Sequence, residues 1–116
     1  MTIEIKKISE EFSKGNFPAT YNHFADDIEW KIIGDKIISG KENTIAFCTK
    51  MITEMDSSTL NNINVIAENN YVAIEGNCNF TNEQGKAAAV EYCDVFRFEE
   101  GKIKTITSYL VSSVVK

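Results

Sequence analysis

Residues 91–98 have the sequence EYCDVFRF, and they are followed by EEG at residues 99–101 and by KIKTITSYLV at residues 102–111. The two segments predict two β-strands joined by a tight turn. Side chains alternate along a strand, so one face of the first strand carries Tyr92, Asp94, Phe96 and Phe98. Asp94 is the only charged residue on that face. A buried carboxylate is costly unless it is hydrogen-bonded, paired or protonated, so we treat Asp94 as the centre of the candidate site.

The turn sets the predicted pairing of the two strands. A three-residue loop that ends with Gly101 in the left-handed conformation is a common hairpin closure. It places Asp94 opposite Ile106 and Tyr92 opposite Ser108. The Asp94 face then continues through Ile106, Ser108 and Leu110, and the opposite face continues through Ile103, Thr105, Thr107, Tyr109 and Val111.

An earlier strand is predicted over residues 71–81, and a second loop that ends in glycine, residues 83–85, joins it to the Asp94 strand. This pairing places Ile74 opposite Asp94 and Gly76 opposite Tyr92. A glycine inside a strand often marks a bend or the close approach of another group. We therefore expect a bent sheet with a cavity on the Asp94 face.

The remaining elements are predicted from hydrophobic spacing and from glycine and proline positions. Helices are expected up to Lys14, after Asn16, and from residues 40–43 to near Met55; further strands are expected at residues 28–33, 36–39 and 59–68. Asp26 and Asp27 are expected to form a turn at the end of the second helix. Three helices cannot cover both faces of a long antiparallel sheet, so the predicted fold class is α+β, with the helices on one face.

The composition is that of one globular domain spanning residues 1–116. A formal net charge of −5 argues against a nucleic-acid or anionic-membrane partner. We find neither an apolar run long enough for a membrane helix nor a signal-peptide pattern, and we expect a cytoplasmic location. Three cysteines and one histidine match no metal-ligand spacing, so no metal and no cofactor are expected.

Local motifs add a family resemblance that covers nearly the whole chain. They are GNF at residues 15–17 with FADD at residues 24–27, GKENTI at residues 40–45, and DVFRF at residues 94–98 with GKI at residues 101–103. Their order and spacing resemble the nuclear transport factor 2-like superfamily and, within it, the ketosteroid-isomerase-like and SnoaL-like (polyketide-cyclase-like) branch.

The resemblance implies a cone-shaped, cystatin-like fold in which a curved antiparallel or mixed sheet wraps around three helices. It also implies that Asp94 occupies the position of a protonated aspartate that donates a hydrogen bond in ketosteroid isomerases. The positions of the isomerase base and tyrosine fall at Ile32 and Ile8 here. A proton shuttle needs a base at its place, so steroid isomerisation itself is not expected.

Two residues are candidates for catalysis, Asp94 and His23. Asp94 is either a neutral acid that hydrogen-bonds a ligand or a structural carboxylate bonded to Tyr21, Trp30 or a backbone donor. His23 is either a general base at the cavity mouth or an ordinary helix histidine. The predicted ligand-binding residues are Trp30, Tyr92, Ile32, Tyr21, Phe96, Ile106, Ser108, Leu110 and Ile74.

Two functions are compatible with these features. The first is binding of a small, largely apolar molecule that directs a carbonyl or hydroxyl at Asp94, with an isomerase- or cyclase-like reaction on an unassigned substrate left open. The second is a non-catalytic association domain with a filled cavity. A cavity of about 300 Å³ or more separates the first from the second. The sheet face opposite the helices lacks an intramolecular cover, and we expect a homodimer through it.

Overall fold

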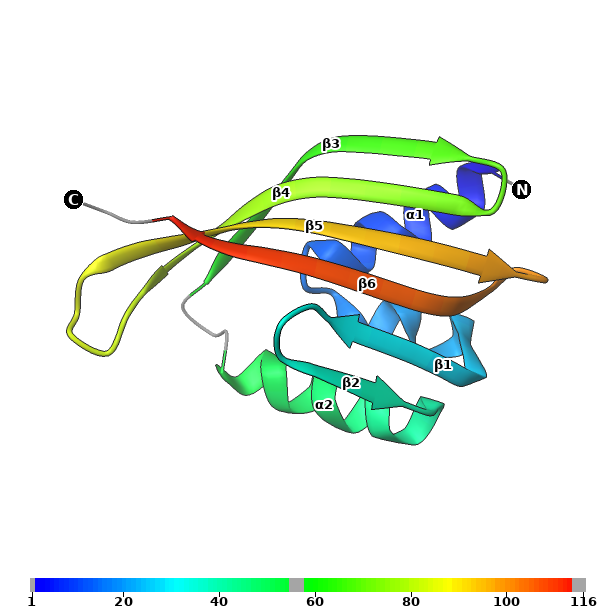
Figure 1. The fold of residues 1–116 in the computed structure, drawn as a ribbon, viewed down its shortest axis with the longest axis horizontal. Coiled ribbons are helices and arrows are strands. Elements are labelled where there is room, and N and C mark those ends of the chain that lie inside the picture. Colours follow the sequence, from blue (N-terminus) through cyan, green and yellow to red (C-terminus); the bar gives the residue numbers. More distant parts are fainter. Residues whose placement is uncertain (1, 55–57, 114–116) are drawn as a thin grey trace.

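The structure of the chain, a computed structural model, describes residues 2–54 and 58–113. The elements are α1 (Thr2–Ser13), η1 (Phe17–His23), β1 (Phe24–Ile32), β2 (Lys36–Ser39), α2 (Lys41–Glu54), β3 (Thr59–Glu68), β4 (Tyr71–Thr81), β5 (Ala87–Glu99) and β6 (Lys102–Ser113) (Figure 1). The second helix, η1, is a 3-10 helix with Pro18 in its first turn. The expected end of the third helix near Met55 lies outside the described residues.

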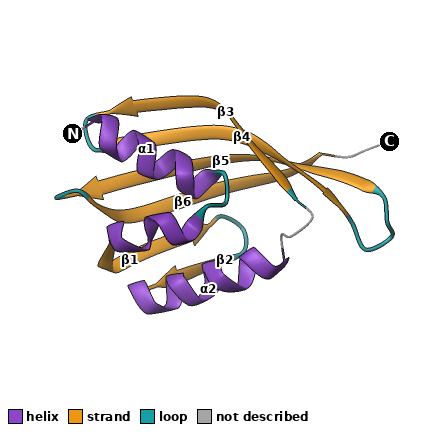
Figure 2. Ribbon diagram, turned by 180° about the vertical axis from the view of Figure 1, so that it is seen from behind, coloured by secondary structure: helices purple, strands orange, loops and turns teal. Residues whose placement is uncertain are grey.

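The six strands form one mixed sheet in the order β2-β1-β6-β5-β4-β3. All neighbouring strands are antiparallel except β1 and β6, which are parallel. Figure 2 shows the helices together on one face of the sheet. The predicted α+β class, with helices on one face of a mixed sheet, is therefore confirmed.

The pairing of β4 with β5 is as predicted, with Ile74 opposite Asp94 and Gly76 opposite Tyr92. The pairing of β5 with β6 was predicted wrongly by two residues, because Asp94 lies opposite Ser108 rather than Ile106. The turn has two residues, Glu100 and Gly101, and both have positive φ angles, 52° and 79°. Positive φ at both central residues is typical of the tight type I′ hairpin turn.

An irregularity in β6 compensates for the shorter turn. Arg97 pairs with Thr105 but Phe98 pairs with Ile103, so Lys104 is an extra residue in the ladder. Ile103 was expected on the uncovered face, but it lies opposite Phe98 and is fully buried. Beyond this irregularity the shift of two residues preserves the side-chain alternation, so Ser108 remains on the Asp94 face.

β1 begins earlier than predicted, at Phe24, because Phe24 is buried and pairs with Ile103. The expected turn at Asp26 and Asp27 is instead an irregular part of this strand, between the pairs formed by Phe24 and Glu29. Asp27 is exposed and forms an ion pair with Lys104, the extra residue of β6. The two irregularities therefore meet between neighbouring interior strands, at the end of β6 nearest to the β5–β6 turn.

Phe12 of α1 is the centre of the aromatic core. Its ring centroid lies 4.9 Å from that of Phe17, 5.1 Å from Trp30, 5.6 Å from Phe96 and 6.2 Å from Phe24. The first three contacts have the edge-to-face geometry that aromatic pairs prefer. Phe12 thus holds the last turn of α1 against the sheet, and this fixes the position of its neighbour Ser13.

Candidate functional site

A cavity of about 430 Å³ lies between the helices and the inner face of the sheet. Most of its wall is apolar: Phe12, Phe17, Trp30, Ile32, Phe47, Met51, Leu60, Cys78, Phe80, Val90, Tyr92 and Leu110. The polar and acidic lining residues are Ser13, Ser58, Ser108, Asp35, Glu54 and Asp94. An apolar wall with a few convergent polar groups is typical of small-molecule sites.

Four of the lining residues, Ser13, Trp30, Asp94 and Ser108, form a connected network that we call the polar cluster. The Ser13 hydroxyl donates to Asp94 Oδ2 at 2.8 Å, and the Ser108 hydroxyl donates to Asp94 Oδ1 at 2.6 Å. Trp30 Nε1 donates to Ser108 Oγ at 2.8 Å. Asp94 is only 7% exposed, and each of its two carboxylate oxygens accepts one of these hydrogen bonds.

The end of α1 fixes the position of Ser13. The N–H of Gly15 donates to Phe12 O, the N–H of Asn16 donates to Glu11 O, and Gly15 has a φ of 95°. These two bonds and the left-handed glycine are the Schellman motif that ends many helices. Ser13 is thereby the last residue of α1, buried and directed at the strand that carries Asp94.

Burial raises the pKa of the Asp94 carboxyl above its ordinary value, and the hydrogen bonds from Ser108 and Ser13 oppose that rise. Desolvation is the larger effect, because the groups that oppose it among the described residues are the two hydroxyls of Ser108 and Ser13 and not a cation. A carboxyl of this kind holds its proton at a higher pH than an exposed aspartate does. Strongly perturbed acids inside cavities are candidates for functional sites.

Tyr92 forms a second polar link near the cavity. Its hydroxyl donates to Asn62 Oδ1 at 2.6 Å, and Asn62 Nδ2 donates to the carbonyl oxygen of Glu10 in α1 at 3.0 Å. Burial, and to a lesser degree the charge of Asp94, raises the pKa of the Tyr92 hydroxyl. Tyr92 is therefore a neutral wall residue whose hydroxyl hydrogen is used to connect β5 through β3 to α1.

The structure brings six of the predicted site residues together in the cavity: Asp94, Trp30, Ile32, Tyr92, Ser108 and Leu110. The proposed partnership of Asp94 with Trp30 is indirect and runs through Ser108. Asp94 is thus both hydrogen-bonded by protein groups and part of the cavity wall, so the two alternatives for this residue overlap.

The structure places the other five predicted residues outside the cavity wall. Phe96, Ile106 and Ile74 share the inner face, but they are fully buried in the core, where Phe96 packs on Phe12 of α1. Tyr21 packs on Phe24 and its hydroxyl lies 3.1 Å from Thr49 Oγ1. His23 ends η1 and is half-buried away from the lining residues. A position on the same strand face as Asp94 therefore does not by itself place a residue in the cavity wall, because the helices cover part of that face.

Sequence reasoning missed Ser13 as a site residue. Ser13 and Asp94 are 81 positions apart in the chain, and no local pattern connects them. The helical wall residues Phe12, Phe17, Phe47 and Met51 were not predicted as site residues either.

Within residues 2–54 and 58–113, no group of three or more metal-ligating side chains is close enough to hold an ion. The three cysteines are free. None of the described helices is long and apolar enough to cross a membrane.

Comparison with known proteins identifies the family. Residues 5–106 match the SnoaL-like domain. An NTF2-like protein of unknown function from Cytophaga hutchinsonii is 48% identical, with a TM-score of 0.93, and the match covers 96% of this chain and 99% of that one. Among functionally curated proteins, no sequence matches this chain.

More distant structures share the fold. An NTF2-like protein of unknown function from Burkholderia pseudomallei is 19% identical over 93% of this chain and 88% of its own, with a TM-score of 0.75. An LEH-like epoxide hydrolase from M. tuberculosis is 18% identical over 95% of this chain and 84% of its own, with a TM-score of 0.74. The predicted resemblance is confirmed: the chain belongs to the SnoaL-like domain family and has the nuclear transport factor 2-like fold.

Proposed function

We propose that the chain binds a small, largely apolar molecule in the cavity, with one polar group of that molecule at Asp94. The observation that carries the proposal is the cavity of about 430 Å³ with Asp94 in its wall. This volume exceeds the roughly 300 Å³ at which small-molecule pockets begin. It favours ligand binding over the alternative of an association domain with a filled cavity.

The chemistry of the wall supports an apolar ligand. Twelve of the eighteen lining residues are apolar or aromatic, and the buried polar groups gather at the polar cluster. Burial of apolar surface contributes about 25 cal/mol per Å². The hydrophobic effect therefore supplies most of the affinity in this proposal, and the polar cluster sets the orientation of the ligand.

Binding rather than steroid isomerisation is proposed because the isomerase positions are apolar here. Ile32 lines the cavity, and Ile8 packs against the core. Neither side chain can remove a proton from a carbon acid. Asp94 is the buried carboxyl of the cavity wall, and it is the candidate acid or base for an isomerase- or cyclase-like reaction on the bound molecule.

Intrinsic fluorescence tests the proposal, because Trp30 is the only tryptophan of the chain and lines the cavity. Titration with a neutral apolar alcohol such as cyclodecanol is expected to change the Trp30 emission to a saturating value. Asp94→Asn keeps the shape of the side chain and is expected to change the affinity more than the free energy of unfolding. Asp26→Asn, an exposed carboxyl outside the cavity wall, is the matched control.

No saturable change in wild-type emission would contradict ligand binding. If Asp94→Asn greatly lowered the free energy of unfolding and left the affinity unchanged, Asp94 would be structural. Either result is separable from a general loss of folding, because Asp26→Asn should resemble the wild-type protein in both measurements.

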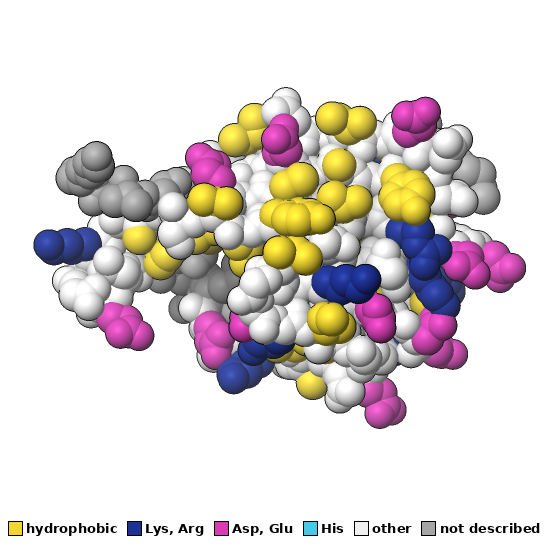
Figure 3. All heavy atoms as spheres, viewed as in Figure 1, with side chains coloured by type: hydrophobic (Ala, Val, Ile, Leu, Met, Phe, Trp, Pro, Cys, Tyr) yellow, Lys and Arg dark blue, Asp and Glu magenta, His cyan; other side chains and the backbone are white. Residues whose placement is uncertain are grey.

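We also propose a homodimer through the outer face of the sheet, the face opposite the helices. One row of side chains crosses this face through all six strands: Ile37, Lys31, Thr107, Val95, Ala73 and Ile66. Hydrophobic side chains gather over the middle of the face (Figure 3). The two ends of the row, Ile37 and Ile66, are more than half exposed, at 61% and 64%.

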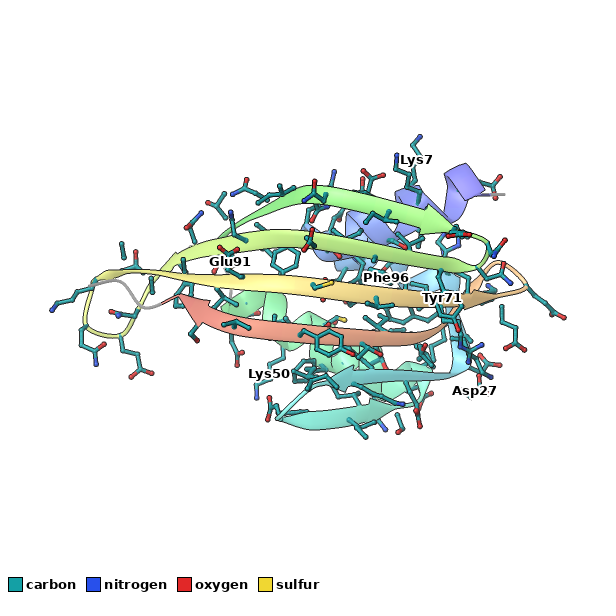
Figure 4. The ribbon with its side chains drawn as sticks, turned by 45° about the horizontal axis from the view of Figure 1, so that its top comes forward. Lys7, Asp27, Lys50, Tyr71, Glu91 and Phe96 are labelled. Carbon is teal, nitrogen blue, oxygen red and sulfur yellow. The ribbon has the colours of Figure 1, made fainter. Side chains whose placement is uncertain are left out.

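The chemistry around this row suits a second copy of the same chain. Tyr71, Tyr109 and Val111 extend the apolar surface and are about half exposed or more. Tyr71 of β4 lies opposite Arg97 of β5, as predicted, whereas Glu91 lies opposite Val111 rather than Tyr109. Tyr71 and Glu91 lie toward opposite ends of this strand pair (Figure 4). The face therefore carries aromatic residues, a cation and an anion, which a twofold axis can make self-complementary.

A further inference from the structure

The chemistry of the polar cluster fixes the direction of each of its hydrogen bonds. An indole N–H can only donate, so Trp30 donates to Ser108. An ionised carboxylate can only accept, so Ser108 and Ser13 both donate to Asp94. Each hydroxyl has a single hydrogen. While Asp94 is ionised, every polar hydrogen of the cluster side chains is used inside the cluster, and only oxygen lone pairs remain for a ligand.

Tyr92, the neighbouring polar wall residue, is committed in the same way. The amide nitrogen of Asn62 donates to the carbonyl oxygen of Glu10, so the amide oxygen is the atom that faces Tyr92. The tyrosine hydroxyl must then donate to Asn62, at 2.6 Å. Its hydrogen is consumed as well, and what it can still offer is a lone pair.

We propose that the cavity selects ligands by hydrogen-bond donation: the polar group of the ligand is a donor, a hydroxyl or an amine, rather than a carbonyl. The inference rests on the proposed function, because it requires a ligand in the cavity. A donor group pairs with a lone pair of Ser13, Asp94 or Ser108. A carbonyl oxygen in the same place meets only other acceptors, and an unpaired buried polar group weakens binding.

Protonation of Asp94 reverses this preference, because the carboxyl then has a hydrogen to donate. Other titratable groups in the cavity wall are Tyr92 of β5, Cys78 of β4, Glu54 of α2 and Asp35 of the β1–β2 turn. Glu75 and Cys93 lie on the outer face beside the strand pair that carries Asp94. Burial raises the pKa values of Tyr92, Cys78 and Cys93, so these three stay neutral when Asp94 titrates.

Cyclodecanol and cyclodecanone test the inference, because they share one ring size and differ in the presence of a hydrogen-bond donor. Their affinities are measured by Trp30 fluorescence from pH 5 to pH 9 on the wild-type protein. We expect the alcohol to bind roughly tenfold more tightly than the ketone where Asp94 is ionised, as one unpaired buried acceptor implies. The ratio of the alcohol affinity to the ketone affinity is expected to decrease as the pH decreases and Asp94 takes up a proton.

Two variants separate the polar cluster from a general effect of cavity shape. Asp94→Asn introduces an N–H₂ group and does not titrate, so the ketone should gain relative to the alcohol and the ratio should become independent of pH. Ser108→Ala removes the acceptor of the Trp30 indole and frees its N–H, so it should also shift the ratio toward the ketone. The second variant keeps the test available if the first folds poorly. Asp26→Asn should leave the ratio unchanged.

A wild-type ratio that favours the ketone at pH 9, or a ratio that neither variant alters, overturns the inference while leaving ligand binding intact. A ratio that favours the alcohol at every pH and inverts in Asp94→Asn supports it, with Asp94 ionised throughout the range. Failure of both probes to bind contradicts the proposed function itself and the inference with it.

Discussion

Gly76 and Tyr92 lie directly opposite each other in β4 and β5, and the tyrosine ring covers the glycine. A β-carbon at position 76 would overlap Cζ and the hydroxyl oxygen of Tyr92 and the carbonyl oxygen of Asn61. No side chain fits at this position without movement of the backbone or the ring. The glycine therefore allows Tyr92 to reach Asn62 and form part of the cavity wall.

Gly76→Ala is expected to lower the free energy of unfolding by about 1–3 kcal/mol, as overpacking of a well-packed site does. Urea unfolding monitored by circular dichroism measures the effect. In a Tyr92→Ala background the additional cost should be smaller, because one of the two contacts is gone, but it should not vanish, because the Asn61 carbonyl remains. An equal cost in both backgrounds would show that the tyrosine ring does not restrict position 76.

The raised pKa of Asp94 gives the stability a defined pH dependence. Below the unfolded-state pKa, about 3.9, the carboxyl is protonated in both states and its contribution is fully present. Between that pH and the higher native pKa, the native state binds more protons, so the free energy of unfolding falls as pH rises. The Asp94→Asn variant has no titrating group at this position, so its free energy of unfolding does not fall with pH for this reason.

The difference in unfolding free energy between wild type and Asp94→Asn, measured in urea from pH 4 to pH 8, should therefore decrease with rising pH. Glu11 and Asp27 have lowered pKa values and give the opposite slope, but both proteins contain them and the difference cancels their effect. A difference that increases with pH would mean that the native state stabilises the ionised carboxylate.

Tyr92→Phe should destabilise the protein by about 1–3 kcal/mol, because it leaves Asn62 Oδ1 without its donor in a partly buried place. Tyr21→Phe is the matched control, since the Tyr21 hydroxyl pairs with Thr49 Oγ1 at an exposed place outside the cavity wall. Thermal or urea unfolding of the two variants measures the contrast. Equal, small losses in both would show that the link between Tyr92 and Asn62 contributes little.

The proposed dimer predicts a specific response to charge on the outer face. Val95→Glu places a carboxylate in the middle of the six-strand row and should convert the dimer to a monomer in sedimentation at micromolar concentration. Thr53→Glu adds the same charge to an exposed position of α2, on the helix side, and should leave the dimer intact. A wild-type monomer under these conditions, or a Val95→Glu protein that remains dimeric, rules out this interface.

Much of the fold was predictable because it depends on local signals. The register of β4 with β5 followed from alternation and a loop ending in glycine, and Gly76 opposite Tyr92 indicated the close approach that the structure contains. The β5–β6 register was not predictable in the same way, since EEG at residues 99–101 is compatible with a loop of two or three residues. Beyond the extra residue Lys104 the side-chain alternation is the same for both loop lengths, so the sequence pattern does not distinguish them.

The site was predictable only on the strands. Asp94, Tyr92 and Ser108 were identified because strand alternation places them on one face. Ser13 could not be identified, because its contact with Asp94 depends on how α1 packs over the sheet. The same packing removes Phe96 from the cavity by covering it with Phe12, which no pattern within β5 reveals.

The indole N–H of Trp30 gives the most direct test of ligand binding at the polar cluster. It is the only indole of the chain and donates to Ser108, which donates to Asp94, so its NMR resonance reports on the cluster. Titration of the nitrogen-15-labelled protein with cyclodecanol should shift this resonance to a saturating value, with a weaker response in Asp94→Asn. A resonance that stays in place up to the solubility limit of the alcohol would contradict the account.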